Sequence, residues 1–156
     1  GSRLSTERVQ LHWTCKHFDA LTPADLYSIL RLRSEVFVVE QNCVYLDADN
    51  KDRLAWHLMG WNNDMLVACS RILPSGVAFT EASIGRVVTS PTERRLGAGK
   101  ELMRLSMEKL YELFGNAPIR IGAQLYLKKF YESFGFVQCG EVYLEDGIKH
   151  IEMVRR

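Results

Sequence analysis

SPTERRLGAGK, residues 90–100, joins an apolar run to a long amphipathic pattern. Residues 84–89 before it are compact and β-branched, as in a strand, whereas leucine and methionine recur at helical spacing after it. Gly97 and Gly99 remove side chains at the junction, so backbone N–H groups there can approach a ligand closely. The first turn of the following helix adds unpaired N–H groups and a positive dipole end. This order predicts a site for a pyrophosphate, although a plain strand-to-helix turn would also use two glycines.

The composition indicates one α/β domain. A chain of 156 residues with 47% hydrophobic content can bury a core but is too short for two domains of ordinary size. Its 20 basic and 19 acidic residues give a net charge of +1, which argues against nucleic acid or an anionic membrane as the main partner. We therefore expect a single domain over residues 3–156 that binds a small molecule. Residues 1–2 are interpreted as a tag remnant.

The cysteines and histidines indicate no metal site. The four cysteines are far apart, without a Cys-x-x-Cys pair, and the four histidines lack the spacing of zinc ligands. There is also no apolar span of about 20 residues and no secretory signal pattern. These features predict a cytoplasmic protein with reduced thiols, without a membrane partner.

Alternating apolar residues and turn residues predict the strands. The predicted strands cover residues 9–18, 54–61, 65–73, 84–89 and 119–123, with a further one from Phe136. Asn62-Asn63-Asp64 predicts a hairpin turn, and Glu145-Asp146-Gly147 predicts a second hairpin tip. The order strand, helix, strand over residues 84–123 predicts a parallel crossover.

Capping residues predict the helices. Thr22 is placed as the N-cap of a helix, with Pro23 at its first position and Asp25 at its third. The long helix after the glycine turn ends at residues 115–118, and a further helix is expected over residues 124–134. Residues 43–52 are too polar for the core and predict an exposed loop.

Two motifs in this order resemble those of the GNAT acetyltransferases. Arg94-x-x-Gly97-x-Gly99 resembles the acetyl-CoA signature of that superfamily, written Q/R-x-x-G-x-G/A. It is neither a Walker loop, which needs Gly-Lys-Ser/Thr, nor a Rossmann fingerprint, which needs a third glycine. The second motif, residues 130–136, is similar to the Y-x-x-x-G-F segment that closes the GNAT core. Residues 33–41, 84–87, 123–124 and 145–153 look like the ElaA-type branch, so the likeness spans nearly the whole chain.

The resemblance implies a fold and a cofactor. The fold is α/β: a mixed, splayed β-sheet of about six to seven strands flanked by about four helices. Acetyl-CoA would lie between strands 84–89 and 119–123, with strand backbone pairing to the pantetheine amides and the glycine turn holding the pyrophosphate. The implied cofactor-binding residues are Val87, Val88, Thr89, Arg94, Arg95, Leu96, Gly97, Ala98, Gly99, Lys100, Gln124 and Tyr131. Arg95 stands where many members have another glycine, and Val44 replaces a proline common in the ElaA-type branch.

The implied activity is transfer of an acetyl group to a primary amine of a small molecule or peptide, by direct attack in a ternary complex. Tyr131 would give a proton to the departing thiolate, although an aromatic packed in the core is its other interpretation. The amine also needs a general base, for which the candidates are Glu40, His57, Glu145 and His150, with Glu40 and His57 predicted as catalytic. Glu40 and three aspartates, Asp47, Asp49 and Asp52, come from segments that the GNAT fold usually places over the acceptor. They predict either a cationic amine as the acceptor or a solvated loop without a role in binding.

Two other functions remain open. An acyl-homoserine lactone synthase, of related fold, also has an Arg-x-x-Val-Phe pattern before an acidic loop, but the intact Arg94–Gly99 loop argues against it. A non-catalytic acyl-CoA-binding module would keep this loop but would not need Tyr131. Acetyl transfer is therefore preferred. The acceptor's identity and a homodimeric state stay open.

Overall fold

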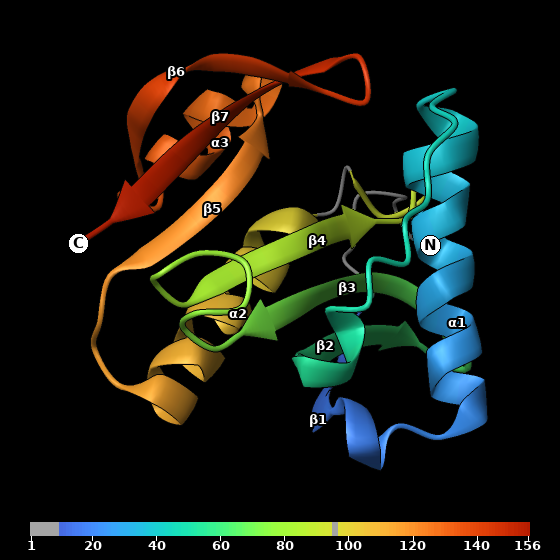
Figure 1. Cartoon of the computed structure of the whole chain (residues 1–156). Helices are drawn as coiled ribbons and strands as arrows, with labels where there is room; N and C mark the ends of the chain where they lie inside the picture. The colour runs from blue at the N-terminus through green and yellow to red at the C-terminus, as the bar shows by residue number, and fades with distance from the viewer. Residues whose placement is uncertain (1–9, 95–96) are drawn as a thin grey trace, which may run out of the picture.

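The computed structural model describes residues 10–94 and 97–156 (Figure 1). Its strands and α-helices are β1 (His12–His17), α1 (Pro23–Arg33), β2 (Trp56–Asn62), β3 (Met65–Leu73), β4 (Ser83–Thr89), α2 (Ala98–Phe114), β5 (Ile119–Gln124), α3 (Lys128–Glu132), β6 (Val137–Glu145) and β7 (Ile148–Arg155). A π-helical segment, η2 (Ser34–Glu40), continues α1. The described part of the chain thus has seven strands, as expected for the splayed α/β fold, and three α-helices, where about four were expected.

The strands form two sheets that meet at one point. The first has the order β1-β2-β3-β4 and the second the order β5-β7-β6, and all of the pairs within them are antiparallel. The sheets join through a parallel bridge between Ala82 and Ile119, where the Arg120 N–H donates to the Ala82 carbonyl at 3.0 Å. Beyond this bridge β4 and β5 diverge (Figure 1), which confirms the predicted splay between these two strands.

Local sequence signals define the helix ends. The Thr22 hydroxyl accepts from the Asp25 N–H at 3.0 Å, and the Asp25 carboxylate accepts from the Thr22 N–H at 3.1 Å. This capping box begins α1 at Pro23, as predicted. Gly97 precedes α2 with φ at 77°, and Gly115 ends this helix with φ at 84°, conformations that glycine adopts without steric cost.

Helices cover both faces of the first sheet. Ile29 and Leu32 of α1 pack on one side with Met59 of β2, whereas Leu102 of α2 packs on the other side with Leu58. Because successive strand residues point to opposite faces, Leu58 and Met59 contact different helices. Figure 1 shows α1 and α2 on opposite sides of this sheet. The sheet is therefore buried on both faces, which gives a rigid base for the end of β4.

Both predicted hairpins are present. The β2–β3 turn holds Asn63 at φ 54°, and the β6–β7 turn holds Asp146 at φ 51° and Gly147 at φ 77°. Asparagine, aspartate and glycine tolerate this left-handed region better than other residues. No helix in residues 10–94 and 97–156 is long and apolar enough to cross a membrane.

The helix expected over residues 124–134 is shorter than predicted. Gln124 is the last residue of β5, where it pairs with His150 of β7, and α3 covers Lys128–Glu132. A 3-10 turn at Leu125–Leu127 links the two elements. Pairing with β7 thus extends the strand by one residue beyond its apolar run, which helical periodicity alone does not reveal.

Candidate active site

A cavity of about 640 Å³ lies where the two sheets separate. It is lined by β4 and β5, by η2 and the loop after it, by α3, by Gly99 of α2 and by the β6–β7 hairpin. Its size is within the range of small-molecule sites in proteins. Elements far apart in sequence therefore enclose a single cavity along the free edge of β4.

The edge of β4 offers unpaired backbone groups to this cavity. Beyond the bridge at Ala82, β4 pairs with β3 but not with β5, so one of its edges faces the gap. Val87, Val88 and Thr89 line the cavity from this edge. An extended ligand that carries amides can pair with such an edge as an added strand would.

A β-bulge shapes the same edge. On β3, Arg71 pairs with Gly85 and Cys69 with Val88, so β4 has one residue more than β3 over this stretch. Arg86 lies in the bulge with φ at 48°. An extra residue bends a strand and increases its twist. The bulge therefore contributes to the divergence of β4 from β5 at the cavity.

The glycine turn brings the start of α2 to the cavity. Gly99 lines it, and a Cβ added at Gly99 would meet only the Phe130 ring within 4.0 Å among the described atoms. Gly97, the N-cap residue, has no side chain that could cap the helix, so the first N–H groups of α2 can bind an anion. Ala98 is buried, and Lys100 is exposed and does not line the cavity. Arg95 and Leu96, also predicted to bind the cofactor, lie outside the described residues.

Arg94 lines the cavity but is bound to Glu40. Its two terminal nitrogens donate to the two Glu40 oxygens at 2.7 and 2.6 Å, and one of them also donates to the Thr89 carbonyl at 3.2 Å. These hydrogen bonds lower the pKa of the Glu40 carboxyl. Glu40, predicted as a catalytic base, is therefore an ion-pair partner whose affinity for a proton is reduced.

Gln124 is bound in the same way to a residue that sequence analysis did not single out. Its side-chain amide exchanges two hydrogen bonds of 3.3 Å with that of Gln41. Gln41 follows Glu40 at the end of η2, so consecutive side chains of this segment contact Arg94 and β5. In the sequence, the abrupt change from apolar to polar residues at Glu40-Gln41 could have indicated that these side chains make such contacts.

Tyr131 of α3 lines the cavity from its buried side. Its ring is in edge contact with Phe130 and Phe136, with centroid distances of 5.1 and 6.2 Å. Burial raises the pKa of the phenol, so the hydroxyl stays protonated at neutral pH. A buried tyrosine in this state can donate a proton but is a poor base.

His57, the other predicted catalytic residue, does not line the cavity. It is 1% exposed on β2, and its Nε2 lies 2.9 Å from the Asp52 carbonyl. Burial lowers the pKa of this histidine. His150 and Glu145, named as base candidates but not predicted as catalytic, do line the cavity.

The three aspartates of the acidic loop are paired with arginines, so they are neither free for a cationic substrate nor left in solvent as single charges. Arg33 is 1% exposed, and it contacts Asp47 at 2.7 Å and Asp52 at 2.8 Å. Arg71 contacts Asp49 at 2.6 Å and Asp52 at 3.0 Å. The prediction that residues 43–52 are too polar for the core was wrong for Asp47 and Asp52, which are buried because they neutralise buried arginines.

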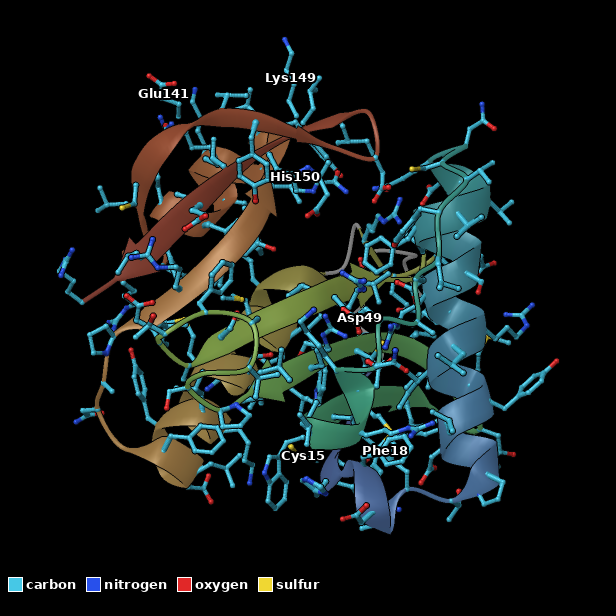
Figure 2. All side chains as sticks on the ribbon, viewed as in Figure 1. Cys15, Phe18, Asp49, Glu141, Lys149 and His150 are labelled. Atoms are coloured by element: carbon cyan, nitrogen blue, oxygen red, sulfur yellow. The ribbon has the colours of Figure 1, made fainter. Side chains whose placement is uncertain are left out.

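A third arginine ties this loop to the cavity. Arg86 Nε lies 2.8 Å from the Asp47 carboxylate, and its guanidinium lies 6.0 Å from the Tyr45 ring. A terminal nitrogen of Arg86 also lies 3.4 Å from the Asp49 carboxylate, beside β4 (Figure 2). The sequence pattern that could have predicted these ion pairs is three arginines inside apolar elements together with three closely spaced aspartates. The role of the ion pairs is to hold the loop against the bulge of β4.

Comparisons with known proteins agree with this geometry. Residues 47–156 match the family described as Acetyltransferase (GNAT) domain. The chain is 44% identical to the protein ElaA of Escherichia coli over 147 residues, which cover 93% of this chain and 96% of ElaA. The crystal structure of Escherichia coli ElaA superposes with a TM-score of 0.88 at 42% identity, covering 94% of this chain and 100% of that one.

Two further solved structures share the fold. The structure of an acyl-CoA N-acyltransferase from Pseudomonas aeruginosa has a TM-score of 0.90 at 42% identity, covering 94% of this chain and 100% of that one. A CoA-dependent acyl-homoserine lactone synthase has a TM-score of 0.72 at 17% identity over 93% of this chain and 82% of its own, a likeness of fold alone. The wedge between β4 and β5, the two motifs beside it and these relatives together show that the chain belongs to the GNAT acetyltransferase family, in which ElaA is one of its relatives.

Proposed function

We propose that this protein transfers the acetyl group of acetyl-CoA to a primary amine of a small molecule or peptide, by direct attack in a ternary complex. The observation that carries the proposal is that one cavity contains the free edge of β4, the start of α2 and Tyr131. An acyl-CoA offers a matching order of groups, because its pantetheine arm carries amides between the pyrophosphate and the thioester. Membership of the GNAT family supports the same donor.

The donor side is assigned as follows. Val87, Val88 and Thr89 pair with the amides of the pantetheine arm, since this edge of β4 is not paired with β5, although the Thr89 carbonyl also accepts from Arg94. The N–H groups at Gly97–Gly99 receive the pyrophosphate, and Arg95, Leu96 and Lys100 belong to the same proposed contact. Arg94 and Gln124 line the cavity beside this path, where Arg94 is bound to Glu40 and Gln124 to Gln41. Both are therefore available to a ligand only if they exchange one partner for another.

The chemistry needs a proton donor at the leaving sulfur. In the proposed reaction the amine nitrogen attacks the thioester carbonyl carbon, a C–N bond forms and the C–S bond breaks. Tyr131, whose raised pKa keeps the hydroxyl protonated at neutral pH, gives this proton to the departing thiolate as the C–S bond breaks. The rigid ring contacts with Phe130 and Phe136 support this role, because a proton donor must be held in position.

We further propose that the reaction takes place in the cytoplasm. Cys15, Cys43, Cys69 and Cys139 are all unpaired, which suits a reducing compartment.

The test is a panel of primary amines assayed with acetyl-CoA, following both free thiol release and the mass of the product. With one class of amine we expect thiol release to be about 10-fold or more faster than in the amine-free control. The mass of that amine should increase by one acetyl group. Propionyl- and octanoyl-CoA are assayed in parallel. Tight CoA binding without thiol release with any amine would instead make the protein an acyl-CoA-binding module.

A further inference from the structure

Most charged residues that line the cavity are already neutralised. Glu40 is paired with Arg94, and Arg86 is paired with Asp47 and Asp49. Among the described residues, the remaining carboxylates and imidazole at the cavity are at the β6–β7 hairpin: Glu145, Asp146 and His150. The other titratable residues of the lining carry a thiol or a phenol: Cys43, Tyr45, Tyr126 and Tyr131. The hairpin is thus where an acceptor would meet groups that can take up its charge or its proton.

The geometry of His150 leaves one ring nitrogen free to accept a proton. Its Nδ1 lies 2.8 Å from the Ile148 carbonyl, and a carbonyl can only accept, so Nδ1 carries the hydrogen in the neutral ring. The lone pair is therefore on Nε2. Tyr143 stacks on the ring with centroids 5.8 Å apart and planes at 28°, which fixes its orientation.

The surroundings of His150 favour uptake of a cation. The residue is 8% exposed, and its Nε2 lies 3.6 Å from the Glu145 carboxylate, beyond hydrogen-bond distance but close enough for charge attraction. On the other neighbouring strand its register partner is the neutral Gln124. Figure 2 shows Lys149 projecting away from the molecule, whereas His150 lies on the inner side of the hairpin.

A second contact holds the hairpin tip beside the cavity. The Cys43 thiol donates to the Asp146 carbonyl at 3.5 Å, so the loop after η2 is anchored to the turn between β6 and β7. The positive φ angles at Asp146 and Gly147 make this turn tight. Glu145 and Asp146 are thereby kept at the cavity, where the Glu145 carboxylate adds negative charge next to His150.

We infer that His150 is the general base of the acceptor step and that Glu145 attracts the acceptor as a primary ammonium ion. This inference rests on the proposed acetyl transfer. Nε2 of His150 removes one proton from the ammonium, and the amine lone pair then attacks the thioester carbon. The C–S bond breaks, and the thiolate takes the proton of Tyr131. The second proton on the new amide nitrogen restores Tyr131, while His150 returns its proton to solvent. Overall, the ammonium ion and the thioester give an amide, a thiol and one proton.

The test compares His150→Gln with the parent protein and with His12→Gln, a control at an exposed position of β1 outside the cavity lining. At about pH 7 we expect His150→Gln to lower kcat by about 10²- to 10⁴-fold, the usual effect of losing a general base. Its rate should rise steadily with pH as the free amine becomes more abundant. The parent should instead show an acid limb, because a protonated imidazole cannot accept the proton of the ammonium ion. Calorimetric titration with CoA alone should give the same affinity for all three proteins.

Glu145→Gln keeps the test decisive if His150→Gln does not fold, since Glu145 is largely exposed. It should raise KM for a cationic amine and move the acid limb of kcat/KM to lower pH, because the protonated ring loses its neighbouring carboxylate. Parent-like pH profiles and rates in both variants would overturn the role of His150 while leaving acetyl transfer intact. Absence of acetyl transfer by the parent with every amine would overturn both proposals.

Discussion

Glu40 and Arg94 are 54 residues apart in the sequence and form a two-point ion pair, with N–O distances of 2.7 and 2.6 Å. The pair joins the end of η2 to the turn before α2, and both residues line the cavity. A carboxylate bound in this way occupies a guanidinium that could otherwise contact a phosphate. The ion pair therefore links a predicted base to the proposed cofactor loop instead of leaving it free for catalysis.

We expect Glu40→Gln to keep kcat within about threefold of the parent, because its proton affinity is already reduced. The affinity for CoA should rise by no more than about fivefold, since an exposed ion pair contributes about 1 kcal/mol at most. Steady-state kinetics and calorimetric titration measure these two effects. Glu108→Gln, which removes an exposed partner of Arg104, is the matched control. A loss of about 100-fold in kcat would restore Glu40 as the base.

Gly99→Val should weaken CoA binding by about tenfold or more, because the branched side chain would stand at the proposed pyrophosphate site, where the backbone has to approach the ligand. The fold should survive, since a Cβ at Gly99 has room beside Phe130. Gly97 is the poorer test, because its φ of 77° makes any side chain strained whatever the ligand. Calorimetric titration gives the affinity, and the thermal midpoint checks the fold. Unchanged affinity in folded Gly99→Val would remove α2 from the cofactor site.

Tyr131→Phe should lower kcat by about 10- to 10⁴-fold while leaving CoA affinity and the thermal midpoint nearly unchanged. The ring contacts with Phe130 and Phe136 are kept, and only the proton is lost. Because the pKa of Tyr131 is raised by burial, its ionisation should cause no loss of activity in the parent up to about pH 10. Steady-state kinetics across this range is the measurement. Turnover of Tyr131→Phe at the parent rate at every pH would make the hydroxyl structural.

Asp52→Asn should destabilise the protein by about 3–5 kcal/mol, because Arg33 and Arg71 would lose the charge of a shared buried partner. Chemical denaturation measures this change. Asp64→Asn, at an exposed turn, is the control and should change stability by less than about 0.5 kcal/mol. An equally small effect at Asp52 would show that the arginines find other partners.

The same network predicts a loss of stability in acid. Burial by itself would raise the pKa of Asp49, but hydrogen bonds and charge from Arg71 outweigh it and hold the pKa below its usual value. Asp52 is shifted in the same direction against its burial, through Arg33 and Arg71. A carboxyl with a lowered folded pKa stabilises the fold above its unfolded pKa of about 3.9 and loses this effect as pH falls toward the folded value. The thermal midpoint should therefore drop between about pH 5 and pH 2.

Features that depend on neighbouring residues could be read from the chain. Thr22 and Asp25 cap a helix three residues apart, and the turns at residues 62–64 and 145–147 contain the residues that tolerate left-handed backbone. The glycine turn, the long helix and the order of strands follow from the same short-range signals. The motifs around Arg94 and Tyr131 then pointed to the GNAT family, to which the chain belongs.

Pairings between distant residues depended on the tertiary structure. Glu40 was predicted as a base but meets Arg94, and Gln124 meets Gln41 across 83 positions. Asp47 lies 14 positions from the buried Arg33 that it neutralises, in a loop whose composition predicts exposure. Composition reports how polar a segment is, whereas burial depends on whether each charge finds a partner when the chain folds. For the same reason the sequence favoured Glu40 and His57 as the base over Glu145 and His150, whereas the fold leaves His57 outside the cavity lining and brings His150 to it.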